Sequence, residues 1–155
     1  MITVVETRDY KLIAALNEEV QNLHASLHPE MFKPFVKSDM EKALENYLNE
    51  PNAYGYLVQK DGIAIGCAVF FIREAKENAF HYTIKTLYVD QISVLTKHQR
   101  TGAGKMLMDQ AEKLAKEKSI QKIELDHWSA NVVAASYFRK SGYKLYRERL
   151  FKVII

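Results

Sequence analysis

The stretch Tyr88–Met108, YVDQISVLTKHQRTGAGKMLM, carries the pattern that decides the fold. It begins as an apolar strand, passes through the segment QRTGAG from Gln99 to Gly104, and continues directly into a helical pattern. The first backbone amides of a helix have no partner within the helix, and the helix dipole places positive potential at the same end. This order of strand, short loop and helix therefore favours an anion-binding site.

The residues of the loop suit a diphosphate. Gly102 and Gly104 have no Cβ, so the main chain can adopt unusual dihedral angles and come close to a ligand. Arg100 and Lys105 add positive charge beside the amides. A short glycine turn between a strand and a helix is often only a turn, so the loop by itself does not decide the function.

The string QRTGAG matches the pattern Q/R-x-x-G-x-G/A and resembles the acyl-CoA-binding signature of the GNAT family of N-acetyltransferases. It lacks the third glycine and the distal acid of a dinucleotide fingerprint, and it lacks the GK[ST] of a P-loop. A nucleotide-binding domain is therefore the least favoured class.

A second segment, Asn131–Tyr143, resembles the late helix of the same family, N-x-x-A-x-x-[aromatic/apolar]-Y-x-x-x-G-[FY]. The resemblance extends from about Val4 to Val153, and its specific motifs lie between Asp90 and Tyr143. It implies one GNAT domain over residues 1–155 with an α/β (α+β) fold: a central, mostly antiparallel sheet with a splayed parallel pair, flanked by about four helices.

The sequence pattern predicts the elements in the same order. The predicted strands are Ile2–Glu6, Tyr54–Gln59, Ile63–Arg73, Ala79–Leu95, Gln121–Asp126 and one or two within Lys144–Val153, with a hairpin turn at Asp61-Gly62. The predicted helices run from Asp9 to His24, from Ser38 or Asp39 to Asn49, from Gly104 to Lys118, and from Asn131 to a closing Gly142.

The resemblance also implies which residues contact acetyl-CoA as co-substrate. The pantetheine arm would bind the strand backbone at Ile92, Ser93 and Val94, where an amide would also bind the thioester oxygen as its negative charge develops. The remaining predicted contacts are Gln99, Arg100, Thr101, Gly102, Ala103, Gly104, Lys105, Asn131 and Phe138.

Acetyl transfer to an amine requires a base, because the amine is largely protonated at neutral pH. Asp90 is the first candidate, since it lies four residues before Val94, where some relatives carry a catalytic Glu, and a carboxylate in an apolar strand is costly without a partner or a role. A structural role for Asp90 is an equal alternative. Weaker candidates end the next strand: Glu124, Asp126 and His127.

The proton donor departs from the family pattern. The tyrosine that many relatives use as general acid corresponds to Phe138, which has no hydroxyl, while Tyr137 precedes it by one residue, or about 100° around the helix. Three alternatives remain open: Tyr137 or another tyrosine donates the proton, water protonates the thiolate, or the site binds acyl-CoA and turns over poorly.

The acceptor pocket is expected near the segment Leu23–Pro34, which is rich in aromatic and histidine residues, with Trp128 as a further wall or as a packing residue. His24 and His28 have the i,i+4 spacing of a zinc chelate, but no further ligand cluster follows, so no metal is expected.

Composition and charge argue against several other classes of protein. A net charge of +3 and scattered lysines and arginines do not indicate nucleic-acid binding. Cys67 is the single cysteine, so no internal disulfide can form and a reducing compartment is expected. The apolar run Ile63–Ile72 is about half the length that a bilayer helix needs, and the N-terminus lacks a leader pattern. We expect a cytoplasmic protein that does not bind membranes.

Together these features predict an enzyme that moves an acetyl group from acetyl-CoA to a primary amine by direct transfer in a ternary complex. The acceptor is a small molecule or a peptide that the sequence does not identify. A non-enzymatic acyl-CoA-binding module is the alternative, favoured by Phe138. Dimers are frequent in the family, so a homodimer that pairs the tail Tyr146–Ile155 with a second copy is a further expectation.

Overall fold

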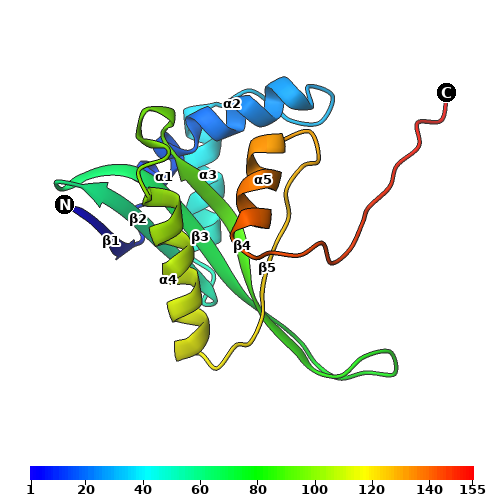
Figure 1. Ribbon diagram of the computed structural model, residues 1–155. Coiled ribbons are helices and arrows are strands. Elements are labelled where there is room, and N and C mark those ends of the chain that lie inside the picture. The colour runs from blue at the N-terminus through cyan, green and yellow to red at the C-terminus, as the bar shows by residue number, and fades with distance from the viewer.

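A single mixed sheet organises the chain, and the computed structural model describes all residues from 1 to 155. The strand order is β1-β2-β3-β4-β5 (Figure 1). Strands β1 to β4 pair antiparallel, and β5 joins β4 in parallel, which confirms the predicted sheet type. The strands are β1 (Ile2–Thr7), β2 (Ala53–Lys60), β3 (Ile63–Ala75), β4 (Ile84–Val94) and β5 (Ile123–Leu125).

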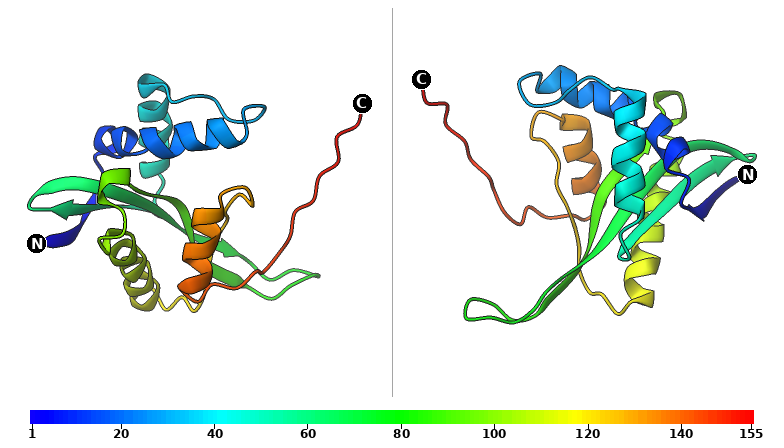
Figure 2. Two further views of the ribbon diagram at one scale, coloured as in Figure 1. Left: turned by 45° about the horizontal axis from the view of Figure 1, so that its top comes forward. Right: turned by 180° about the vertical axis from the view of Figure 1, so that it is seen from behind.

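Helices cover both faces of the sheet (Figure 2). One hydrophobic core joins α1 and α3 to one face through Ile13, Leu44 and Val69, and a second core joins α4 and α5 to the other through Phe70 and Leu107. None of the helices is both long enough and apolar enough to cross a membrane. The helices are α1 (Tyr10–Leu16), α2 (Glu18–Leu27), α3 (Lys37–Leu48), the 3-10 turn η1 (Thr96–His98), α4 (Ala103–Glu117) and α5 (Val132–Lys140).

Local turn and cap chemistry follows the sequence at three positions. At a fourth the prediction is wrong, since neither Ser38 nor Asp39 caps α3, which begins at Lys37 after Val36 and has no side-chain cap. Asp61 and Gly62 have φ angles of 51° and 81°, so both lie in the left-handed region that a two-residue hairpin turn between β2 and β3 requires. Asn131 caps α5, since its Oδ1 accepts the Ala134 amide at 3.2 Å. Gly142, with a φ of 93°, follows the end of α5. The predictions at these three positions are confirmed.

The single helix predicted from Asp9 to His24 is wrong, because the structure divides it into α1 and α2 at Asn17. The Leu16 carbonyl accepts the Ser93 hydroxyl of β4 at 3.1 Å. Asn17 is buried and donates its side-chain amide to the Ile13 carbonyl. A contact with a strand 77 residues away therefore breaks the helix, and a local pattern could not indicate it.

Strand boundaries also differ from the prediction, and β5 spans Ile123–Leu125 rather than Gln121–Asp126. β4 begins at Ile84 rather than Ala79, because residues 76–83 form the tip of a β3–β4 arm in which Asn78 Oδ1 accepts the amides of Phe80 and His81 at 2.8 and 3.2 Å. The segment Lys144–Val153 forms no strand at all. Its β-forming residues pair with no other strand, and a strand is stable only when it is paired.

Gly66 allows β3 to lie close to the end of β4. A Cβ added at Gly66 would lie 2.5 Å from the Ser93 carbonyl oxygen, 2.9 Å from Val58 Cγ1 and 3.1 Å from Val94 Cα. Backbone and core atoms can move little to relieve such contacts. Gly66 therefore sets the position of the β4 segment that ends at the loop before α4.

We predict that Gly66→Ala lowers the free energy of unfolding by roughly 1–3 kcal/mol, through overpacking between β3 and β4. Chemical denaturation monitored by circular dichroism measures the loss. Gly104→Ala is the matched control, since a Cβ there meets no atom closer than 3.5 Å. Equal stability of Gly66→Ala and the wild-type protein would contradict the close approach.

Candidate active site

The loop before α4 presents a row of unpaired backbone amides. No amide from Arg100 to Lys105 has a hydrogen-bond partner, and the first amide bonded in α4 is that of Met106, to the Gly102 carbonyl at 3.0 Å. Gly102 caps the helix with a φ of 89°, and Arg100 also has a positive φ, 61°. Alternation of positive and negative φ angles along a loop turns successive backbone amides toward one side, as in an anion-binding nest. The loop therefore has the geometry of a phosphate site.

Side chains hold this loop in place. Gln99 donates its side-chain amide to the Val94 carbonyl at 3.2 Å, and the Thr101 hydroxyl donates to the His98 carbonyl at 2.6 Å. Ala103 is buried at the start of α4 and fixes the helix to the core. Lys105 is exposed and pairs with Asp109 at 2.7 Å. The amides thus keep their arrangement without a ligand, while the cationic side chains at the loop remain on the surface.

The parallel pair β4–β5 separates immediately beside this loop. β5 pairs with β4 only from Leu87 to Val89, so the following residues, Asp90–Val94, have no neighbour on that side. On the other side they remain paired with β3. The splayed pair that the sequence resemblance implied is therefore present, and it leaves unpaired strand backbone that leads to the loop.

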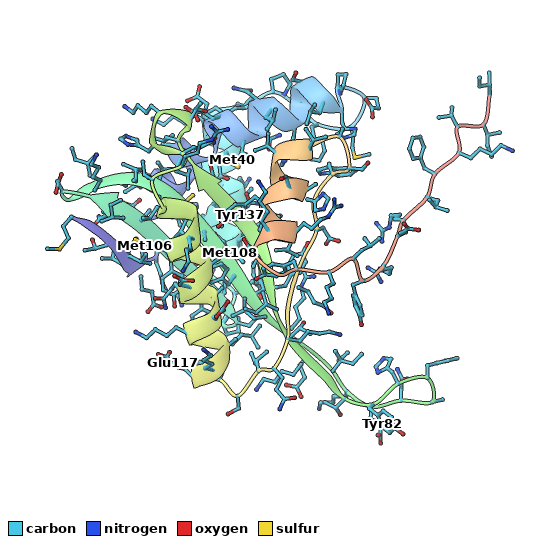
Figure 3. All side chains as sticks on the ribbon, viewed as in Figure 1. Met40, Tyr82, Met106, Met108, Glu117 and Tyr137 are labelled. Atoms are coloured by element: carbon cyan, nitrogen blue, oxygen red, sulfur yellow. The ribbon has the colours of Figure 1, made fainter.

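Tyr137 lies beside the loop before α4, close to the end of β4. Its hydroxyl is 3.5 Å from the position that a Gly104 Cβ would occupy, and Val94 Cγ2 is 3.9 Å from the same position. Figure 3 shows the side chain between α5 and α4. Burial raises the pKa of Tyr137 above its ordinary value, so its hydroxyl stays protonated at neutral pH. Phe138, in contrast, has its ring in the core beside Tyr143.

Asp90 occupies a β-bulge in β4. Val69 of β3 is opposite Gln91 and Phe70 is opposite Val89, so Asp90 has no partner residue across the strands. Bulges often redirect a side chain next to an active site. Burial raises the pKa of the Asp90 carboxyl, while the Gln91 side-chain amide, which donates to it at 3.2 Å, and the Arg73 guanidinium oppose the rise. Asp90 is therefore a stronger base than an exposed aspartate.

Two residues beside Asp90 were not predicted as site residues. The Arg73 guanidinium lies 3.6 Å from the centroid of the Tyr88 ring, and the Tyr88 hydroxyl donates to Asp126 Oδ2 at 2.6 Å. Burial, with a further contribution from Asp126, raises the pKa of Tyr88 to about 12. No sequence pattern indicates this cluster, because its members come from β3, β4 and the end of β5 and meet only in the folded sheet.

An aromatic cluster connects α2 with the loop after β5. The His28 and Trp128 rings lie 4.8 Å apart, and Phe32 meets Trp128 edge-on at 5.3 Å and His24 at 5.1 Å. His28 Nε2 is buried without a hydrogen-bond partner. Burial and the neighbouring His28 lower the pKa of His24. The segment Leu23–Pro34 and Trp128 were expected near one another, and the structure brings them together.

The remaining candidates are distributed around these features. Ile92 and Val94 pack against the α4 side of the sheet, whereas Ser93 faces α1 and bonds to the Leu16 carbonyl. Glu124 pairs with Lys122 at 3.6 Å, and His127 is exposed. No group of three or more histidine, cysteine, aspartate or glutamate side chains has an arrangement that could hold a metal ion.

The sequence profile of the Acetyltransferase (GNAT) family matches residues 18–143, which includes every part of the site. No curated protein sequence matches the chain significantly.

Solved structures share the fold at low sequence identity. A single-residue mutant of the BH1408 protein from Bacillus halodurans has a TM-score of 0.89 at 15% identity, covering 100% of this chain and 99% of that one. Aminoglycoside 6'-N-acetyltransferase AAC(6')-IG from Acinetobacter haemolyticus has a TM-score of 0.72 at 22% identity, with 99% and 98% covered. AAC(6')-Iy, in complex with the bisubstrate analog CoA-S-monomethyl-acetylneamine, has a TM-score of 0.72 at 16% identity, with 100% and 99% covered.

We predict that Asp90→Asn raises the melting temperature near neutral pH by on the order of a few degrees. The folded-state pKa of Asp90 is above its unfolded value, so the charged carboxylate is penalised in the fold at every pH above that folded-state pKa. The gain should disappear below about pH 3, where the carboxyl is protonated in both states. Calorimetry at several pH values measures it. Asp109→Asn, at an exposed carboxylate paired with Lys105, should give no gain. A gain that does not depend on pH would contradict the burial argument.

Proposed function

Because the chain belongs to the GNAT family of acetyltransferases, we propose that residues 1–155 form one domain that moves an acetyl group from acetyl-CoA to a primary amine by direct transfer in a ternary complex. The observation that carries the proposal is the row of unpaired amides from Arg100 to Lys105, next to the unpaired backbone of Asp90–Val94. A diphosphate and an extended amide-containing arm are the chemical groups that these two features suit.

Coenzyme A would bind along this path. The amides of the loop and the positive end of the α4 dipole hold the diphosphate, and exposed Arg100 and Lys105 add charge. The pantetheine arm lies along Ile92, Ser93 and Val94 as an additional strand. A backbone amide of this segment then donates to the thioester oxygen, whose negative charge grows as the amine attacks. Asn131 and Phe138 shape the site by capping and packing α5.

Asp90 is the proposed general base. Its bulge position, its raised pKa and its location on the strand that would carry the pantetheine support this role. Tyr137 and Val94 both lie beside Gly104, and Val94 is four positions along the strand from Asp90, roughly 13 Å. We propose that Asp90 removes the amine proton through a water molecule, because a direct contact of both groups with one reacting centre would need a shorter separation.

Tyr137 is the proposed proton donor to the leaving thiolate. Its raised pKa keeps the hydroxyl protonated, and it borders the path from the loop to the strand. Phe138 favours a second function, a non-enzymatic acyl-CoA-binding module, since the residue at the family's usual donor position has no hydroxyl and packs in the core.

The proposed acceptor is a small-molecule amine. The aromatic cluster of His24, His28, Phe32 and Trp128 would form a wall of the acceptor pocket, and within it the buried His28 Nε2 has no hydrogen-bond partner. Two of the structures that share this fold are aminoglycoside acetyltransferases, and this chain would accordingly act on an amine of that general size. No metal has a part in the proposed chemistry.

We predict that acetyl-CoA with a panel of small amines releases free thiol in the presence of the protein, as measured with a thiol reagent. Gly104→Glu should abolish both thiol release and coenzyme A binding by calorimetry, because it sets a carboxylate against the diphosphate. Lys116→Gln changes the net charge by the same amount at the other end of α4 and should retain both. Coenzyme A binding without thiol release from any amine would favour the binding module. Loss of neither in Gly104→Glu would exclude the site.

We predict that Asp90→Asn and Tyr137→Phe each lower kcat by roughly 10²–10⁴-fold while the KM for acetyl-CoA changes little. In the wild-type protein the rate should fall as pH drops through the raised pKa of Asp90, and Asp90→Asn should remove this acid limb. Tyr143→Phe is the matched control for Tyr137→Phe, since it removes a hydroxyl at the same end of α5 but outside the contact with Gly104.

Other effects of these substitutions on kcat, KM or the pH profile would overturn the proposed roles of Tyr137 and Asp90. An unchanged kcat with a raised KM for acetyl-CoA in Tyr137→Phe would make Tyr137 a contact of the co-substrate rather than a donor. An acid limb that persists in Asp90→Asn would return Asp90 to a structural role.

A further inference from the structure

Arg73 of β3 is a half-buried cation without an anionic partner. Its guanidinium lies 3.6 Å from the centroid of the Tyr88 ring, and this stacking holds it in place. None of the ion pairs and none of the side-chain hydrogen bonds of the chain includes Arg73. Its N–H donors are therefore free, and a guanidinium presents them as a fork that matches the two oxygens of a carboxylate.

These donors border a hollow in the sheet. Arg73 lines a hollow of about 500 Å³ at the place where the β3–β4 arm leaves the body (Figure 1). Thr86 is directly opposite Arg73 across the two strands, so the two side chains are on the same face of the sheet. Thr86 lines the same hollow, and its hydroxyl is a second donor. Apolar atoms of Ile72, Ala75 and Ile84 complete this part of the lining.

The carboxylates around the hollow already have partners or water. Asp126 Oδ2 accepts the Tyr88 hydroxyl at 2.6 Å. Glu124, which also lines the hollow, pairs with Lys122 at 3.6 Å. Glu74 is exposed, so water solvates its charge. The charged group that lacks a partner here is therefore the guanidinium, and the ligand that it can accommodate is an anion.

The position of Arg73 relative to Asp90 allows one molecule to contact both. The Tyr88 ring that holds the guanidinium is two positions along β4 from Asp90, roughly 7 Å. The Arg73 charge opposes the rise in the pKa of the Asp90 carboxyl, as a nearby cation does. The proposed path of the pantetheine begins at Ile92, beyond Asp90 along the same strand. An acceptor that extends from Arg73 past Asp90 would thus have its anionic group and its amine at opposite ends.

We propose that the acceptor is an amino acid in which several bonds separate the amine from the carboxylate, and that Arg73, together with the Thr86 hydroxyl, binds this carboxylate. The inference rests on the proposed acetyl transfer and names the class of its acceptor. A phosphate would bring about −1.5 to −2 charges to a face that already holds Glu124 and Asp126, so a carboxylate suits the single free guanidinium better.

Three amines of equal chain length test the proposal. ε-Aminocaproate, hexylamine and hexamethylenediamine end in a carboxylate, a methyl group and a second ammonium. Thiol release from acetyl-CoA gives kcat/KM for each amine. The value for ε-aminocaproate should exceed that for hexylamine by roughly tenfold or more, the size expected of hydrogen bonds between charged groups. Hexamethylenediamine should show no such advantage.

Substitution of Arg73 should remove the preference. Arg73→Gln should lower the ratio of kcat/KM for ε-aminocaproate to that for hexylamine to about one, and Arg73→Lys, which keeps the charge without the fork, should retain part of it. Any effect on Asp90 acts on both amines alike and cancels in this ratio. Lys85→Gln, at an exposed residue next to Thr86, removes the same charge and should leave the ratio unchanged. Circular dichroism verifies that each variant is folded.

Binding without turnover separates this inference from the proposed activity. In an NMR titration, the Arg73 Nε–H signal, identified by its loss in Arg73→Gln, should shift with ε-aminocaproate and not with hexylamine. This shift without thiol release from any amine would contradict the proposed activity and leave the carboxylate site in place. No shift with ε-aminocaproate, a preference for hexamethylenediamine, or a preference for ε-aminocaproate that persists in Arg73→Gln would each overturn the inference.

Discussion

The separation of β5 from β4 after Val89 is the constraint on which the rest of the site depends. A parallel strand that diverges leaves backbone donors and acceptors of Asp90–Val94 unpaired at the edge of the sheet, and the chain then turns into a loop whose amides are also unpaired. Groups of this kind are costly to bury without a partner, so they remain accessible and chemically specific. The bulge at Asp90 begins where the separation begins, and it brings a carboxylate to the same opening.

Residues with no proposed chemical role hold the site in position. Gln99 and Thr101 tie the loop to neighbouring carbonyls, Ala103 anchors α4 in the core, and Gly66 lets β3 support the end of β4 from the other side. Two cores, one on each face of the sheet, offset the unfavourable features, which are the left-handed Arg100 and the half-buried Asp90. Strain and a raised pKa at one opening of an otherwise well-packed sheet are typical of a functional site.

A second unpaired edge of the sheet lies on the far side of β5. There the short β5 leaves β4 partly uncovered, while the apolar tail of the chain has no strand to join. The same physical rule applies at both places: unpaired strand backbone requires a partner. Beside the loop, that partner would be an extended ligand that lies along Asp90–Val94.

The sequence by itself determined the order of the elements from β1 to α5, and the turn and cap residues at several of their ends. The 3.6-residue and two-residue patterns, the Asp61-Gly62 turn, the Asn131 cap and the glycine loop before α4 act over a few residues, so local chemistry predicts them. Only the tertiary structure decided the break at Asn17, the Arg73–Tyr88–Asp126 cluster, the contact of Tyr137 with Gly104, and the lack of a strand at Lys144–Val153. Each of these depends on groups that are distant in the chain, and whether a backbone group is paired or a carboxylate is buried is fixed by those distant neighbours rather than by adjacent residues.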